Sequence, residues 1–227
     1  MKPLSALLGV VTGAVVTTLG MTSAALAVDF SLRGTFAQDD DVQLFDFSIA
    51  TESAVTLRTY SYAGGTQADG TFIDAGGFDP VLSLFDGDGN FIFLSDDDES
   101  GTVANDPTTG RAYDGFLDIM LKAGDYTLAL TQYNNFSNTT NLADGFRQEG
   151  NANFTSNFAR CTTDSMFCDF TGDVRTNEWA LDILGVRPPS EPDEGEPNPP
   201  TQVPEPATTL AFALAGVGAL VHRRRQT

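Results

Sequence analysis

The chain of 227 residues contains little histidine, cysteine, tryptophan or basic charge. It has one histidine, two cysteines, one tryptophan, and 12 Lys and Arg against 31 Asp and Glu. The histidine, His222, lies beyond the last apolar segment, so the central part of the chain has no imidazole. Ser-His-Asp and Cys-His nucleophiles, histidine-ligated zinc and haem are therefore excluded there. Carboxylate pairs could support hydrolysis, but no pair stands out among so many acidic residues, and we expect no enzymatic activity.

The two cysteines, Cys161 and Cys168, are separated by six residues. A metal site would need further cysteine or histidine ligands, which the central region lacks. In an exported chain, this pair predicts a small loop-closing disulfide.

The acidic excess is concentrated in the central region. Between Ala27 and Ala207 lie all 31 Asp and Glu but only eight of the 12 Lys and Arg, which gives this region a formal net charge of −23. Such a surface repels nucleic acid and anionic lipid but favours solubility and cation binding.

The N-terminal segment has the pattern of a secretory signal peptide. Lys2 precedes an apolar stretch that runs to Leu19, and small residues then lead to Ala25-Leu26-Ala27. A basic residue, an apolar stretch and an A-x-A site predict a signal peptide over 1–27, cleaved after Ala27.

The C-terminal segment predicts a tether and a membrane helix. Eight prolines interrupt the acidic stretch from Arg187 to Pro206, which is typical of an extended linker, here 187–202. The apolar residues 207–221 would span roughly 22 Å as a helix, short of the ~30 Å hydrocarbon core but sufficient if arginines snorkel and the bilayer thins. Three arginines, Arg223, Arg224 and Arg225, would hold that end in the cytoplasm and leave the preceding chain outside.

The order of these C-terminal features resembles the PEP-CTERM sorting signal of exopolysaccharide-producing Gram-negative bacteria. The matching residues are Val203, Pro204, Glu205 and Pro206, followed by the apolar helix and the arginine cluster, so that the signal covers 203–227. The resemblance implies an exported, inner-membrane-anchored precursor that an exosortase processes near Val203–Pro206. It also implies release to, or attachment at, the cell surface or extracellular matrix.

The central region, 28–186, has the alternating pattern of β-strands. Strands are predicted at 43–49, 55–62, 81–85, 91–94, 116–121, 126–133 and 178–184, with 81–94 and 116–133 as two hairpins. Seven or eight strands separated by Gly- and Asp-rich turns predict an all-β fold, an antiparallel β-sandwich with jelly-roll-like architecture. A closed barrel is the alternative.

Acidic side chains on the first hairpin suggest a calcium site. Asp86, Asp88 and Asn90 have the spacing with which calcium loops present hard oxygens, but position six is Phe91 instead of Gly, so this is not an EF-hand. A second set of aspartates lies where the hairpin starts and ends; it comprises Asp79, Asp96, Asp97 and Asp98.

Strand geometry separates these two sets of possible ligands. At ~3.4 Å per residue, paired strands place them roughly 15 Å apart, so one ion cannot bridge them. We therefore expect calcium at one set or at each. Turn residues selected for turn geometry and solubility are the alternative.

The central region also resembles bacterial pre-peptidase C-terminal-type β-sandwich domains. The similarity is carried by FDPVLSLFDGDGN at 78–90, SDDD at 95–98, DGFLDIMLKAGDYTLALTQY at 114–133 and TGDVRTNEWALDILGV at 171–186. The resemblance implies a non-catalytic domain that assists secretion, binds polymers or binds calcium.

Together these features predict an exported surface or matrix protein with a binding or structural role. A polysaccharide partner could use aromatic residues such as Tyr60, Tyr62 and Tyr133 as platforms. The alternatives are a carboxylate-dependent polysaccharide hydrolase and an accessory domain of a separate secreted enzyme. The polar segment 134–176 is expected to be an ordered excursion held to the sandwich by its phenylalanines.

Overall fold

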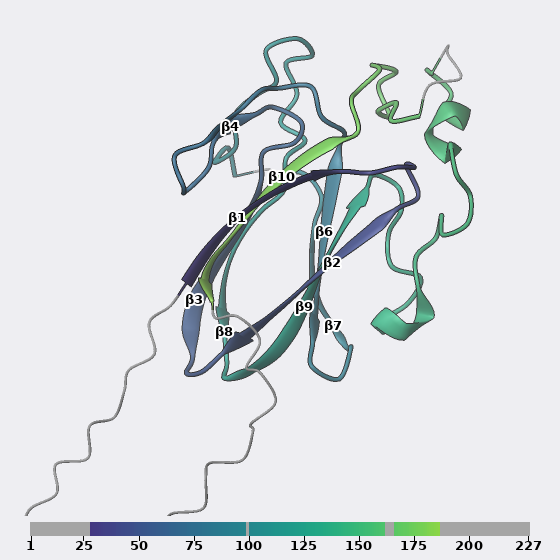
Figure 1. The fold of residues 1–227 in the computed structure, drawn as a ribbon. Helices are drawn as coiled ribbons and strands as arrows, with labels where there is room; N and C mark the ends of the chain where they lie inside the picture. Colours follow the sequence, from purple (N-terminus) through teal and green to yellow (C-terminus); the bar gives the residue numbers. More distant parts are fainter. Residues whose placement is uncertain (1–27, 99, 162–165, 187–227) are drawn as a thin grey trace, which may run out of the picture. The chain divides into compact units, whose positions relative to one another are not determined.

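The central region folds as two antiparallel sheets. The computed structural model describes residues 28–98, 100–161 and 166–186. These residues form two four-stranded sheets, in the orders β1-β10-β3-β8 and β2-β9-β6-β7, and a small β4-β5 ribbon (Figure 1). The strands are β1 (Val28–Thr35), β2 (Val42–Ile49), β3 (Ser53–Thr59), β4 (Gly65–Thr66), β5 (Phe72–Ile73), β6 (Pro80–Asp86), β7 (Phe91–Ser95), β8 (Phe116–Leu121), β9 (Gly124–Gln132) and β10 (Glu178–Val186). The predicted antiparallel sandwich is confirmed, and no described strand joins the two large sheets into a closed barrel.

The core lies between the two large sheets, where period-two alternation puts one face of each strand inside. Trp179, Leu181 and Ile183 of β10 are buried there, as the sequence predicts, opposite Leu128 and Leu130 of β9. The other fully buried side chains include Phe47, Val55, Leu57 and Leu84. Burying one large apolar side chain contributes about 1.5–3 kcal/mol of transfer free energy. This cluster is therefore the main source of the stability of the domain.

Long loops pack on part of the outer face of each sheet. Gln67, from the turn between β4 and β5, donates to the Leu181 carbonyl and the Asp182 carboxylate of β10. On the other sheet, Phe146 packs with Phe85 and Ala129 in a second apolar cluster. The excursion after β9 is therefore ordered where described, and it includes the short 3-10 turns η1 (Leu142–Asp144) and η2 (Phe154–Asn157).

One predicted hairpin is wrong. The segments 116–121 and 126–133 were expected to pair across a turn, but β8 pairs with β3 and β9 lies between β2 and β6 in the other sheet. The turn between β8 and β9 therefore crosses from one sheet to the other. It bends at Gly124, which has φ 157, a backbone angle that few other residues adopt. A turn of this composition is equally compatible with a hairpin, so the sequence does not distinguish them.

The first and last strands are neighbours. β1 pairs antiparallel with β10, with Val28 opposite Val186, and β10 also pairs with β3 on its other side. Figure 1 shows β10 between β1 and β3, with the end of β10 close to the start of β1. Both chain ends of the domain are thus at the end of the sandwich that carries the β6–β7 turn.

The remaining predictions lie outside the described residues. These are the signal peptide 1–27, the linker 187–202 and the sorting segment 203–227 with its helix at 207–221. Within the described part of the chain, no helix combines the length and apolar character needed to cross a membrane.

Candidate metal centre

Three of the predicted ligands gather at the open end of the β6–β7 hairpin. Asp79 comes directly before β6, and Asp96 and Asp97 come directly after β7. Because Leu82 pairs with Ser95, the start of β6 and the end of β7 lie at the same end of the sheet. One carboxylate oxygen from each aspartate lies within 4.8 Å of the other two. The hairpin thereby aims three hard oxygens at one point, which we call the aspartate cluster.

Asp79 is the buried member of the cluster. It is 3% exposed, and its Oδ1 accepts no hydrogen bond. The Tyr133 backbone N–H donates to the Asp79 main-chain carbonyl at 2.8 Å. This bond fixes the main chain but gives the carboxylate no donor. Burial, followed by the negative charges of Asp96 and Asp97, raises the pKa of Asp79 well above its ordinary value.

Asp96 also has a carboxylate oxygen without a donor, although its side chain is less buried than that of Asp79. Its Oδ1 is buried without a hydrogen-bond donor. Burial and then the charge of Asp97 raise the pKa of Asp96 to about 7. Among the described residues, neither Asp79 nor Asp96 belongs to an ion pair. Two ionisable groups therefore sit side by side without the donors or cations that normally accompany buried carboxylates.

Other buried aspartates in the domain do have such donors. Four of them hold loops in place through several hydrogen bonds each: Asp39, Asp114, Asp169 and Asp182. Asp39, for example, accepts from the Phe154 and Thr155 backbone N–H groups and from the Thr155 hydroxyl. Burial of aspartate is common in this protein, whereas Asp79 Oδ1 and Asp96 Oδ1 have no donor.

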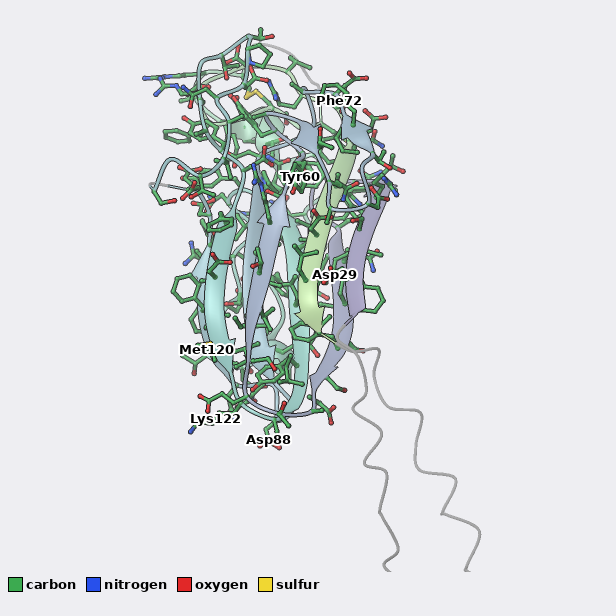
Figure 2. The ribbon with its side chains drawn as sticks, turned by 90° about the vertical axis from the view of Figure 1, so that its left-hand side faces the viewer. Asp29, Tyr60, Phe72, Asp88, Met120 and Lys122 are labelled. Carbon is green, nitrogen blue, oxygen red and sulfur yellow. A yellow bond between two sulfur atoms is a disulfide. The ribbon has the colours of Figure 1, made fainter. Side chains whose placement is uncertain are left out.

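The second predicted set, Asp86, Asp88 and Asn90, forms a hydrogen-bonded turn. Asp86 accepts from the backbone N–H groups of Asp88 and Asn90 and from the Asn90 side-chain amide. These bonds, led by those from Asn90, lower the pKa of Asp86. Gly89 supplies the left-handed φ of 79° that the turn requires. The structure therefore places Asp86, Asp88 and Asn90 in a hydrogen-bonded turn, away from the aspartate cluster, and Figure 2 shows Asp88 at that end of the sandwich.

The carboxylate of Asp98 also has hydrogen-bond donors, although Asp98 follows directly after the cluster. Its carboxylate accepts from the backbone N–H groups of Ser100, Thr102 and Val103. It organises the loop after β7, and its oxygens are not among those that converge in the aspartate cluster.

Two of the suggested aromatic platforms are inside the protein. Tyr60 and Tyr62 are buried, and their hydroxyls donate to Asp182 and Asp169. Burial and the bond to Asp182 raise the pKa of Tyr60 to about 12. Both tyrosines are therefore structural, and neither offers a ring face to a polymer.

Tyr133 belongs to an aromatic cluster that the sequence did not reveal. Its ring makes edge-to-face contacts with Phe136, Phe158 and Phe170, with centroids 5.6, 6.3 and 6.0 Å away. Phe170 is 56% exposed, although it belongs to this cluster. The only signal in the sequence is the frequency of phenylalanine in 134–176, because the partners come together only through the folded excursion. We call these four residues the aromatic wall.

The disulfide is formed. Cys161 and Cys168 are bonded, and Cys168 is fully buried. Phe170 follows two residues later, so the bond restrains the segment that delivers the exposed member of the aromatic wall.

Comparison with known proteins supports the C-terminal prediction. Residues 202–226 match the PEP-CTERM protein-sorting motif. The chain thus carries the signal of an exported protein that is targeted to an exosortase and anchored in the membrane before processing. No curated protein matches the chain.

Among solved structures, the pre-peptidase C-terminal domain of a collagenase from Bacillus anthracis is similar. The match has 9% identity and a TM-score of 0.32, and it covers 70% of this chain and 90% of that chain. This is the group of domains that the sequence resembles. The fold class rests on the two sheets of the domain itself, and so weak a similarity gives no information about ligand or activity.

Proposed function

We propose that the chain is an exported, exosortase-processed surface or matrix protein with a non-catalytic sandwich domain, which holds calcium at Asp79, Asp96 and Asp97. The sorting motif supports export and processing. The observation that supports calcium is the pair of buried carboxylate oxygens without hydrogen-bond donors, in a cluster of three carboxylates.

Electrostatics favours a cation over an unoccupied cluster. A carboxylate transferred from water to a buried position loses solvation, and a second carboxylate within 4.8 Å adds repulsion. A divalent ion bound between the carboxylates replaces their lost solvation and offsets their mutual repulsion. Calcium accepts six to eight oxygens in flexible geometry, whereas magnesium requires a near-ideal octahedron and dehydrates reluctantly. Three carboxylates on two loop ends suit calcium better, with water or a ligand as the remaining donors.

Carboxylate spacing argues against a hydrolase. Retaining glycosidases separate their two carboxyl groups by about 5–5.5 Å and inverting enzymes by about 6.5–9.5 Å, with the substrate between them. The cluster has oxygens from three carboxylates within 4.8 Å of one another, which suits one ion better than a sugar. The hydrolase is therefore the weaker candidate, and an accessory domain of another enzyme is compatible with the same site.

The calcium proposal is tested by melting the purified mature protein with calcium, with magnesium and with EDTA. At about 100 times the dissociation constant, calcium adds about 2.7 kcal/mol, which corresponds to a rise in Tm of about 5–10 °C. We expect less from magnesium. No calcium-dependent rise would eliminate the site.

A matched pair of variants assigns the effect to the cluster. Asp79→Asn removes a buried charge, so it should match or exceed the wild-type Tm in EDTA while losing the calcium-dependent rise. Asp88→Asn, in the exposed turn, should keep that rise. If Asp88→Asn loses it and Asp79→Asn keeps it, the ion binds at the other end of the hairpin.

Export and processing are tested in cells. The predicted cleavage after Ala27 would leave Val28, the first residue of β1, as the new N-terminus. Intact mass of the protein from cells with and without exosortase should show loss of 1–27 in both, and loss of the C-terminal segment near Val203–Pro206 only with the enzyme. A full-length cytoplasmic protein would contradict the proposal.

A further inference from the structure

A groove with mixed lining lies between β7 and the excursion after β9. It has a volume of about 320 Å³. Its lining combines apolar side chains with hydroxyls and one guanidinium group: Phe91, Leu94, Phe136, Ser137, Thr139, Thr140 and Arg147. Arg147 lies over the Phe136 ring at 5.0 Å from its centroid, so the cation is held against an aromatic face. Apolar walls with a few convergent polar groups are typical of a ligand site.

Chain connections and ring contacts link the groove to the aspartate cluster. Leu94 of β7 lines the groove and lies two residues before Asp96, which follows the end of the strand. Phe136 lines the groove and contacts Tyr133, whose N–H donates to the Asp79 carbonyl. Ring contacts extend the surface from Tyr133 to Phe158 and to the exposed Phe170. We infer from these links that the cluster, the groove and the aromatic wall form one surface.

We propose that this surface binds a neutral polysaccharide, with the calcium ion of the proposed function as part of the site. Vicinal sugar hydroxyls complete the coordination of the ion, because three carboxylates leave positions that other hard oxygens can fill. The apolar faces of the sugar rings pack on Phe170 and Phe136. Arg147 and the hydroxyls of the groove donate to further sugar oxygens.

Charge selects a neutral polymer over an acidic one. The region between the terminal segments carries a net charge of −23, and three carboxylates with one calcium ion keep a local excess of one negative charge. A polyuronate would approach against this field, and the single Arg147 in the groove offsets little of it. A neutral chain meets no such barrier.

Affinity electrophoresis of the mature protein tests the proposal. Native gels contain soluble xyloglucan, galactomannan or hydroxyethylcellulose as neutral probes, or polygalacturonate as the acidic probe, each with 2 mM calcium or with EDTA. We expect at least one neutral polymer to retard the protein in calcium, with at least tenfold weaker apparent affinity in EDTA.

Two phenylalanine variants locate the surface. Phe170→Ala should weaken the retardation at least tenfold at an unchanged calcium-dependent Tm. Phe72→Ala, a substitution of a residue that is 70% exposed on β5 outside this surface, should leave it unchanged (Figure 2).

The outcomes separate this inference from the proposed function. A calcium-dependent rise in Tm without retardation by any neutral probe overturns the inference alone. Retardation by polygalacturonate only, or an equal loss of retardation in Phe170→Ala and Phe72→Ala, has the same consequence. Absence of the rise in Tm overturns the calcium site itself, whatever the gels show.

Discussion

The two ends of the β6–β7 hairpin both carry aspartates but differ in hydrogen bonding. At the turn, Asp86 accepts three hydrogen bonds from its own loop, and its pKa is lowered. At the open end, Asp79 and Asp96 each have a buried oxygen without a donor, and their pKa values are raised. The number of hydrogen-bond donors, and not the number of carboxylates, therefore separates a turn aspartate from a candidate ligand. Substitutions at five positions test this distinction.

The largest effect is expected where a buried carboxylate has all its donors. Asp39→Ala leaves two backbone N–H groups and the Thr155 hydroxyl without their acceptor. At about 1–3 kcal/mol per unsatisfied group, we expect the free energy of unfolding to fall by about 3 kcal/mol or more. Urea denaturation should show the same loss in calcium and in EDTA. Asp39→Asn keeps one acceptor oxygen and should lose less; a loss that calcium repairs would show that Asp39 also serves the ion.

The next effect compares two aspartates that are two residues apart. Asp96→Asn should abolish a calcium stabilisation of about 2–3 kcal/mol and cost nothing in EDTA, because it removes a buried charge. Asp98→Asn should cost about 1 kcal/mol in both conditions, because the loop loses a capping acceptor, and should keep the calcium response. Chemical denaturation of both variants with and without calcium measures this. The reverse pattern would move the ligand role to Asp98.

A smaller effect is expected from the backbone of the turn. Gly89 has φ 79, so alanine there takes a left-handed conformation that costs roughly 1 kcal/mol. The added Cβ would lie 3.4 Å from Asn141 Oδ1, which is close but not a clash. Gly89→Ala should therefore lower Tm by about 2–4 °C and leave the calcium-dependent rise intact. Loss of that rise would link the turn to the ion.

The smallest effect is a dependence on pH at the same turn. The Asn90 bonds lower the pKa of Asp86, so the folded state binds the proton less readily than the unfolded chain. The stability that Asp86 contributes is full above the unfolded value near 4 and is lost as pH falls through the lower folded value. We expect the wild type to be more stable than Asp86→Asn at about pH 5, and the difference in their free energies of unfolding to shrink as pH falls from about 5 to 2. Acid unfolding of both proteins measures this difference. A gap that widens in acid would contradict this assignment.

Much of the fold could be read from alternation. The predicted segments 43–49, 81–85, 91–94 and 178–184 each lie within an observed strand, because one buried face imposes a period of two. Strand pairing was less accessible. The turn at 122–125 has hairpin composition but joins different sheets, and pairing of β8 with β3 depends on contacts far apart in sequence.

The candidate site was predictable only in outline. Aspartate spacing and strand geometry separated two groups, and the structure brings three of the suggested residues together. Which carboxylates are already bonded depends on loop conformations that composition does not encode. The aromatic wall was hidden for the same reason, since Tyr133, Phe158 and Phe170 meet only when the excursion after β9 is folded.

The position of β10 has a consequence for the timing of folding. Among the described strands this one is synthesised last, yet it lies between β1 and β3 and supplies Trp179, Leu181 and Ile183 to the interior. A nascent chain that stops before residue 178 therefore has two strands without their shared partner and a core without its central residues. We therefore expect assembly to wait until nearly the whole domain has left the ribosome, and an unfolded chain is the form that a secretion channel can thread.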